Sequence, residues 1–181
     1  MRILITGANG FVGVHLAGAL RREYPDADRR ALVWGDDNRA ELAATDPDLE
    51  VLEADLRRRE TARAAAGFAP DLVFHLAAAA SVGASWQRPE LAFEVNVLGT
   101  LHLLTELRAA GTSPRVVVAT SGEIYGRSAG SARCTEDHPL SPMSPYTASK
   151  AAQDLLAGQE SASGGLPTVR LRLFNHTGPG R

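Results

Sequence analysis

The sequence is nearly devoid of lysine and cysteine. Of its nineteen basic residues only Lys150 is a lysine, and Cys134 is the single cysteine, which excludes a disulfide within the chain. The most apolar stretch, residues 72–83, contains His75 and is too short to cross a bilayer. The net charge is −2 and the arginines are dispersed, so no segment has the basic character of a nucleic-acid or membrane surface. A strand is expected from residue 2, so we expect no signal peptide. Together these features predict a soluble, cytoplasmic protein without nucleic-acid or membrane partners.

The one lysine stands four residues after Tyr146. Arginine does not replace lysine where a compact, rotatable point charge is needed. Residues four apart share a face of a helix, and Ser144 and Pro145 suit the start of such a helix. A nearby ammonium favours phenolate, so we expect a lowered pKa of Tyr146 and a role as general acid or base. The alternative is an exposed tyrosine and lysine on an ordinary amphipathic helix, and the spacing alone does not decide.

A glycine-rich turn follows the first expected strand, residues 2–6, and precedes a helix expected over residues 14–22. In a dinucleotide-binding turn, the first glycine permits a tight turn, the second lets a pyrophosphate approach the backbone, and the third lets helix and strand pack closely. The helix N-terminus offers N–H groups to the phosphates. The spacing here is G-x-x-G-x-x-G, for which a plain strand–helix turn is the alternative. We predict cofactor contacts from Gly7, Asn9, Gly10, Phe11, Val12 and Gly13.

Strands and helices alternate along the rest of the chain. Further strands are expected at residues 31–34, 49–52, 71–75, 115–119 and 168–173, and helices at about 61–66, 89–110 and 146–161, with a polar loop at 126–142. This alternation predicts an α/β fold with a doubly wound, Rossmann-like parallel sheet of about six strands flanked by helices. The length favours one dinucleotide-binding domain, residues 1–181.

Ligands of such sheets bind beyond the carboxyl ends of the strands. Asp36 and Asp37 follow the second strand, where an acidic residue is a candidate for the adenosine ribose hydroxyls and would favour NAD. A simple turn is the alternative for both. Asp55 and Leu56 follow the third strand and are placed near the adenine. Small side chains after the fourth strand let a flat ligand lie against the backbone, which adds Leu76, Ala77 and Ala78 to the cofactor candidates. Close packing is the alternative for these small residues.

These motifs together resemble the extended short-chain dehydrogenase/reductases that act on nucleotide sugars, the NAD-dependent epimerase/dehydratase family. Residues 6–13 resemble the cofactor loop of that family, and residues 96–100 match a helix of its extended members. The ending RLFNHTGPG, residues 172–180, resembles the branch that contains GDP-mannose 4,6-dehydratases and the reductases of their 4-keto-6-deoxy product. Residues 81–86 and 96–100 are more similar to the reductases. The resemblance covers the whole chain.

The resemblance implies roles for four residues. Tyr146 transfers a proton at the sugar 4-oxygen, Ser121 hydrogen-bonds the same oxygen, and Lys150 lowers the pKa of Tyr146 and holds the nicotinamide ribose. NAD or NADP exchanges a hydride with sugar carbon 4. Glu123 has the spacing of the carboxylate that takes a proton from carbon 5 in the dehydratases; a strand-end carboxylate bonded to backbone is the alternative. No metal ligand is assigned.

The substrate implied by the resemblance is a GDP-sugar. Asn175 is expected near the sugar diphosphate, and Ser81, Ser85 and Ser121 are further substrate candidates. The implied reaction is 4-keto reduction of a GDP-4-keto-6-deoxymannose-like substrate. GDP-mannose 4,6-dehydration with Glu123 as base is one alternative, and a non-catalytic cofactor-binding module is another.

Family members continue well past the Gly178–Pro179–Gly180 motif into a lobe that grips the nucleotide sugar. This sequence stops at Arg181, so we expect that lobe to be absent and apolar surface to be exposed at the sheet edge. A truncated gene product, a fragment of a longer protein and half of a split enzyme all remain open. A homodimer formed by the helix near residues 93–108 and the Tyr146 helix is also implied.

Overall fold

One parallel sheet forms the centre of the molecule. The computed structural model describes residues 1–129 and 134–180. Its strands are β1 (Arg2–Thr6), β2 (Asp28–Val33), β3 (Glu50–Glu53), β4 (Leu72–His75), β5 (Arg115–Ser121) and β6 (Thr168–Leu173). They pair in the order β3-β2-β1-β4-β5-β6, and every pairing is parallel. The order reverses between β1 and β4, which confirms the predicted doubly wound fold.

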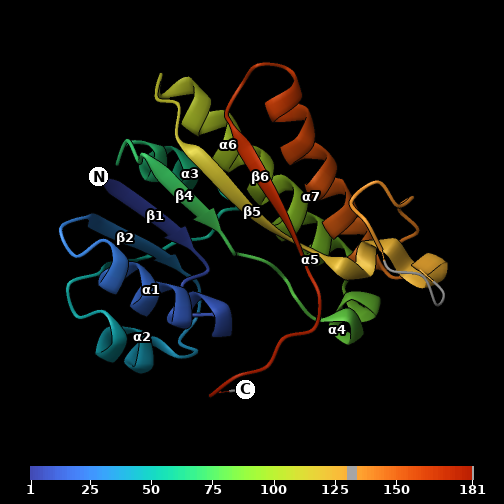
Figure 1. Ribbon diagram of the computed structural model, residues 1–181, viewed down its shortest axis with the longest axis horizontal. Helices are drawn as coiled ribbons and strands as arrows, with labels where there is room; N and C mark the ends of the chain where they lie inside the picture. The colour runs from blue at the N-terminus through green and yellow to red at the C-terminus, as the bar shows by residue number, and fades with distance from the viewer. Residues whose placement is uncertain (130–133, 181) are drawn as a thin grey trace.

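Helices cover both faces of this sheet (Figure 1). The helices α1 (Phe11–Glu23) and α2 (Arg39–Thr45) pack on one face, and α3 (Arg59–Ala66), α6 (Gly99–Ala109) and α7 (Pro145–Ala162) pack on the other. Two short helices, α4 (Val82–Gln87) and α5 (Pro89–Phe93), lie near the carboxyl ends of the strands with a π-helical turn, η1 (Glu94–Leu98), and a 3-10 segment, η2 (Gly122–Ala129).

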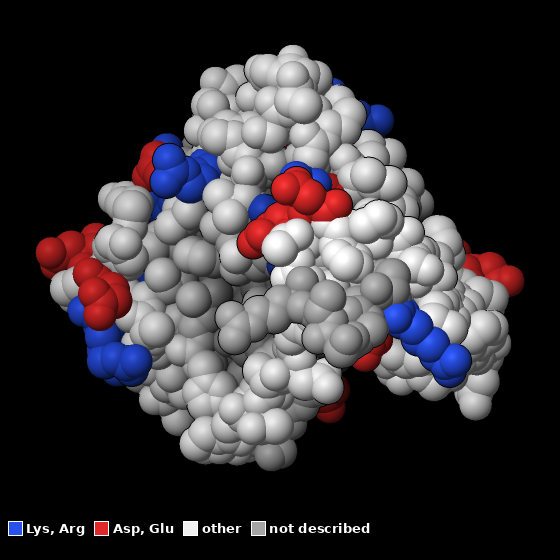
Figure 2. All heavy atoms as spheres, turned by 45° about the vertical axis from the view of Figure 1, so that its right-hand side comes forward, with Lys and Arg blue, Asp and Glu red and all other residues white. Residues whose placement is uncertain are grey.

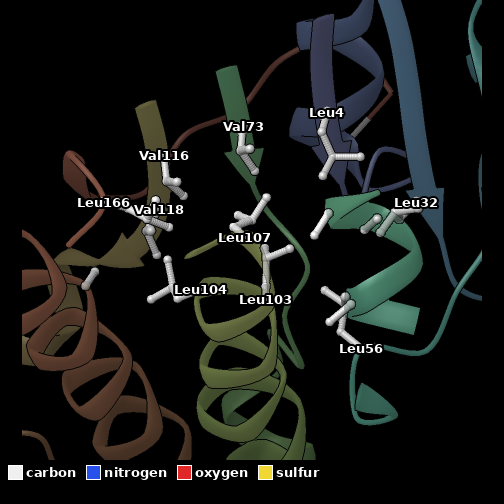
Figure 3. Close-up of a cluster of buried hydrophobic side chains, with 14 residues drawn as sticks. Leu4, Leu32, Leu56, Val73, Leu103, Leu104, Leu107, Val116, Val118 and Leu166 are labelled. Carbon is white, nitrogen blue, oxygen red and sulfur yellow. The ribbon is translucent and has the colours of Figure 1, made fainter. Parts of the chain in front are cut away.

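The two faces of the sheet have separate hydrophobic cores. Leu4 of β1 points into the core beneath α3, α6 and α7, where leucines of α6 meet valines of β4 and β5 (Figure 3). Its neighbours Ile3 and Ile5 point the other way, toward α1 and α2. Alternate residues of a strand face opposite sides, and a central parallel strand is buried on both. The continuous apolar run at residues 3–5 is therefore a consequence of the position of β1.

Element boundaries differ from the sequence predictions in a few places. The helix expected over residues 89–110 is a continuous run of α5, η1 and α6, with a π-helical turn in its middle. Strand β2 begins at Asp28 rather than Ala31, and α2 and α4 were not predicted. Both are short, and Asn38, the residue before α2, adopts a left-handed conformation with φ 52° and makes no side-chain cap hydrogen bond.

The molecular surface combines an apolar edge with scattered charge. Strand β6 is an edge strand, and Val169 and Leu171 on it are 42% and 40% exposed. On the face seen in Figure 2, basic side chains form small separate groups interspersed with acidic ones. Among the described residues, no helix is long and apolar enough to cross a membrane, and no group of three or more His, Cys, Asp or Glu side chains could hold a metal ion.

Candidate functional site

A cleft of about 980 Å³ opens at the carboxyl ends of the strands. The segment after β6 returns across these strand ends toward α1 (Figure 1), where His15 Nε2 lies 3.0 Å from the Pro179 carbonyl oxygen. Most of the residues selected from the sequence line this one cleft: Gly7, Asn9, Gly10, Phe11, Val12, Gly13, Asp55, Leu56, Leu76, Ala77, Ala78, Ser121, Glu123, Tyr146, Lys150 and Asn175.

The glycine turn brings backbone to the floor of the cleft. Gly7 has φ +70°, and a Cβ there would lie 2.7 Å from the Cα of Ala77. A Cβ on Gly13 would lie 2.5 Å from the carbonyl oxygen of Ala8, so α1 packs directly on the turn. Gly10 is the N-cap of α1 and supplies no side-chain cap. The first-turn N–H groups and the positive end of the helix dipole suit an anion such as a pyrophosphate.

Asn9 braces this turn against the second strand. Its Nδ2 donates to the Trp34 carbonyl oxygen at 3.0 Å, while Nδ2 of Asn38 donates to the Asn9 carbonyl oxygen at 3.0 Å. The Asn9 side chain is 6% exposed. Its amide therefore fixes the distance between the glycine turn and the end of β2.

The two acidic residues predicted at the end of β2 lie differently with respect to the cleft. Asp36 does not line the cleft; its carboxylate is fully exposed and lies 3.6 Å from Arg39 Nε. The residues of this segment that do line it are Trp34, Asp37 and Asn38. Gly35, with φ +74°, turns the chain here, which directs Asp36 outward. The indole of Trp34 is 60% exposed, and its position in the wall escaped sequence analysis because a strand-end tryptophan resembles any other strand residue.

Asp55 lies in the same part of the cleft, but its carboxylate is already engaged. Arg57 donates to it from Nη2 at 2.7 Å and from its backbone N at 3.0 Å. These hydrogen bonds hold the pKa of Asp55 below its usual value despite partial burial. The Arg57 guanidinium also lies 5.9 Å from the centroid of the Trp34 ring. Asp55, Arg57 and Trp34 thus form a connected wall around the place predicted for adenine.

The opposite end of the cleft holds the Tyr146 phenol. Helix α7 begins as predicted, with a capping box formed by Ser144 and Thr147 and a proline in the first turn. The Ser121 hydroxyl lines the same cleft. Burial raises the pKa of Tyr146, the charge of Glu123 raises it further, and an interaction with the Ser121 hydroxyl opposes both. The phenol is therefore protonated at neutral pH.

Lys150 does not act on Tyr146 as expected. Its Nζ donates to the Ala119 carbonyl oxygen at 2.7 Å and to Gln153 Oε1 at 2.5 Å. Burial lowers the pKa of Lys150 to about 7, because the charged form loses its hydration. The lysine is not among the groups that shift the pKa of Tyr146. The prediction of a lowered Tyr146 pKa is wrong, since burial of the phenol and the charge of Glu123 raise that pKa.

The two serines predicted near substrate, Ser81 and Ser85, make structural contacts. Ser81 caps α4 by accepting from Ala84 N. The buried Ser85 Oγ donates to the Val82 carbonyl oxygen at 2.7 Å and accepts from Tyr146 N at 3.1 Å. Neither residue lines the cleft. Ser85 instead attaches α4 to the first turn of α7 and so fixes the position of Tyr146.

Asn96 is a further residue at the site. It is fully buried in η1. Its Oδ1 accepts from Ala79 N at 2.8 Å, and its Nδ2 donates to Ser149 Oγ at 2.8 Å. The side chain therefore links the wall after β4 to α7. The sequence offered one signal for this role, an asparagine within a largely apolar helical segment. Such a residue is expected to be buried and hydrogen-bonded, since buried polar groups almost always are.

The sheet order, the glycine turn and the cleft at the strand ends define a Rossmann-like α/β protein with its site at the topological switch point. The chain belongs to the NAD dependent epimerase/dehydratase family, whose sequence profile matches residues 3–181.

Individual relatives have different substrates in their names. The chain is 36% identical over 161 residues to UDP-glucose 4-epimerase of Mycolicibacterium smegmatis, covering 86% of this chain and 50% of that protein. It is 31% identical over 187 residues to GDP-6-deoxy-D-mannose reductase of Pseudomonas aeruginosa, covering 99% and 54%. The crystal structure of DesIV, a dTDP-glucose 4,6-dehydratase from Streptomyces venezuelae with NAD and TYD bound, superposes with a TM-score of 0.86 at 37% identity, covering 99% of this chain and 57% of that one. The chain thus spans about half the length of the relatives it matches.

Proposed function

We propose that the chain binds NAD or NADP in the cleft and is the cofactor-binding part of a nucleotide-sugar oxidoreductase. The observation that carries this proposal is that Ser121, Tyr146 and Lys150 line the same cleft as the glycine turn. One half of such a site holds a pyrophosphate and the other holds a proton donor, which is the arrangement that hydride exchange at a sugar carbon requires.

The residues present fit a dinucleotide. Gly7 lies so close to Ala77 that no side chain could stand between them, and the N-terminus of α1 faces the cleft without a side-chain cap. The small residues 77–80 let a flat ring lie against the backbone. We assign the pyrophosphate to the glycine turn, the adenine to the wall of Asp55, Leu56 and Trp34, and the nicotinamide ribose to Lys150 and Tyr146. The bound nicotinamide supplies or accepts the hydride.

For the chemical step we propose 4-keto reduction of a GDP-4-keto-6-deoxymannose-like sugar. Reduction of a ketone needs a proton donor at the carbonyl oxygen. Tyr146 suits that role because its raised pKa keeps the phenol protonated at neutral pH. Ser121, which lines the cleft with the phenol, would donate to the same oxygen and stabilise the charge that develops on it. Asn175, at the edge of the cleft, is assigned to the substrate diphosphate.

Dehydration of GDP-mannose is the second candidate, and Glu123 favours it. This carboxylate lines the cleft, and its charge acts on Tyr146. A base near the phenol could take the proton from carbon 5 during loss of water. Glu123 N donates to Ser121 Oγ at 3.2 Å, so the backbone at Glu123, rather than its carboxylate, is what holds Ser121. We therefore assign the carboxylate to the base of this second candidate reaction.

We also propose a homodimer formed by α6 and α7. Leu101 on α6 and Leu155 on α7 are 43% and 61% exposed, and Phe93 and Leu98 just before α6 are 42% and 39% exposed. The two helices are joined by a hydrogen bond from Arg108 Nη1 to Glu160 Oε2 at 3.2 Å. A dimer mass at micromolar concentration that falls to a monomer in Leu101→Glu would support this assembly, and a wild-type monomer would contradict it.

Tyr146→Phe tests the reaction. It should abolish turnover of GDP-4-keto-6-deoxymannose, because the proton donor is lost. NADH or NADPH binding should stay within a few fold of wild type, because one ribose contact is lost while the glycine turn, the adenine wall and Lys150 are kept. Tyr24→Phe, at the exposed C-terminal end of α1, is the matched control. Undiminished turnover in Tyr146→Phe would refute the mechanism. If the wild-type chain binds cofactor but turns over neither this sugar nor GDP-mannose, the non-catalytic module is the better description of the isolated chain.

A further inference from the structure

A chain of buried polar side chains runs beneath the cleft from α7 to β1. Its members are Lys150, Gln153, Thr100, His75 and Thr6, each 3% exposed or less. Gln153 Nε2 lies 2.8 Å from Thr100 Oγ1, which lies 2.8 Å from His75 Nε2. His75 Nδ1 in turn lies 2.7 Å from Thr6 Oγ1. Four elements that are far apart in sequence are thus joined, ending one residue before Gly7.

The donors and acceptors fix where the protons lie in this chain. Lys150 only donates, so the amide oxygen of Gln153 faces it and the amide nitrogen donates to Thr100. The single hydroxyl proton of Thr100 is used at the Asn96 carbonyl oxygen, 2.7 Å away. His75 Nε2 must therefore carry a proton, and Nδ1 accepts from Thr6. This requires a neutral imidazole, and burial lowers the pKa of His75 to about 3.

Within residues 1–129 and 134–180, no acidic side chain forms an ion pair with Lys150. On α7, Asp154 is turned away toward Arg170, Arg172 and Thr120. From η2, Glu123 acts on Tyr146, and His75 of β4 is neutral. Burial is the one cause that shifts the pKa of Lys150. Among the described residues, its hydrogen-bond acceptors are the Ala119 carbonyl oxygen and Gln153 Oε1.

We propose that Gln153 is a positioning residue for Lys150: its amide oxygen holds the ammonium at the cleft, and the buried chain through Thr100 and His75 holds the amide. The Gln153 amide is hydrogen-bonded through its oxygen to Lys150 and through its nitrogen to Thr100. It cannot rotate without leaving a buried polar group unpaired. Its catalytic importance depends on the proposed function, because that assigns Lys150 to the reaction. The contact itself does not depend on it.

The single lysine of the sequence makes the test direct. Protein labelled with 15N,13C-lysine gives one lysine side-chain signal, from Lys150, and its shift against pH reports the pKa without assignment. Gln153→Met removes the acceptor and should lower that pKa by about one unit. Gln153→Glu places a carboxylate of the same shape beside the ammonium and should raise it by about one to three units. Gln159→Met, on the exposed side of α7, is the control and should leave the titration unchanged.

The two variants keep the proposal open to refutation even if one of them fails to fold, as judged by circular dichroism. An unchanged Lys150 titration in a folded Gln153→Glu protein would overturn the positioning role. Titration with NADH or NADPH in the same samples separates this from the proposed function. Shifted Lys150 titrations without cofactor binding in wild type would refute the proposed function and leave the positioning role intact. Cofactor binding by the wild type, together with unchanged Lys150 titrations in the Gln153 variants, would refute the positioning role and leave the proposed function intact.

Discussion

Acidification should destabilise this protein through His75. The imidazole is 1% exposed, and burial together with the nearby Lys150 charge lowers its pKa from 6.5 to about 3. The unfolded chain therefore binds more protons than the folded one between about pH 3 and pH 6.5. Since stability falls where the unfolded state takes up protons, the free energy of unfolding decreases as the pH drops through this window.

The size of the effect follows from the two pKa values. At pH 5 the unfolded imidazole is mostly protonated and the folded one is neutral, which costs about 2 kcal/mol relative to pH 7. Lys150 has a folded pKa of about 7, lowered from 10.5. As the pH falls, its protonation lowers the stability of the protein mainly above pH 7 and contributes little below pH 7. Carboxylates with lowered pKa values, such as Asp55, act mostly at lower pH.

Urea unfolding followed by circular dichroism at pH 7 and pH 5 measures this loss. His75→Gln keeps a donor and an acceptor for Thr100 and Thr6 but cannot titrate, so it should lose about 2 kcal/mol less than wild type over the same interval. His102→Gln, on the partly exposed side of α6, is the control and should behave as wild type. Equal losses in wild type and His75→Gln would show that the buried network does not hold a neutral imidazole.

Three further predictions concern packing, charge and chemistry. Gly13→Ala should lower the free energy of unfolding by about 1–3 kcal/mol and weaken NADH binding, because its Cβ would meet backbone at 2.5 Å; thermal melts and fluorescence titration measure both, and a variant as stable as wild type would contradict the close packing of α1. Asp154→Asn should lower the free energy of unfolding by about 3 kcal/mol, because the fully buried carboxylate accepts a hydrogen bond from Arg172 at 2.8 Å. A loss below about 0.5 kcal/mol in urea unfolding would mean that this pair is not buried in solution. Glu123→Gln should lower the pKa of Tyr146, since the Glu123 charge raises it, which a phenolate absorbance titration detects as ionisation at lower pH; an unshifted titration argues against that charge effect. The same variant should remove any dehydration of GDP-mannose while sparing 4-keto reduction.

Much of the fold could be predicted from local patterns. The apolar run at residues 3–5, followed by the glycine turn, identifies a buried strand entering a helix, and β1 and α1 lie there. Ser144 and Pro145 likewise marked the start of α7. These signals come from residues adjacent in sequence, so they can be recognised without a structure.

The directions of side chains at the site could not be predicted in the same way. Asp36 points to solvent because Gly35 turns the chain, and Ser85 bonds to a helix sixty residues away. The pKa of Tyr146 depends on its burial, and the partner of Lys150 is an amide on the next turn rather than the phenol. Each of these depends on tertiary packing, which a residue spacing does not encode.

Cofactor titration of the purified chain tests the central claim most directly. Fluorescence of NADH and of NADPH should show saturable binding of at least one of them, and Gly13→Ala should weaken it. The cofactor that binds more tightly also shows whether the end of β2, at Trp34 and Asp37, accepts a ribose 2′-hydroxyl or a 2′-phosphate. A chain that is folded by circular dichroism yet binds neither cofactor would contradict the assignment of this cleft to a dinucleotide.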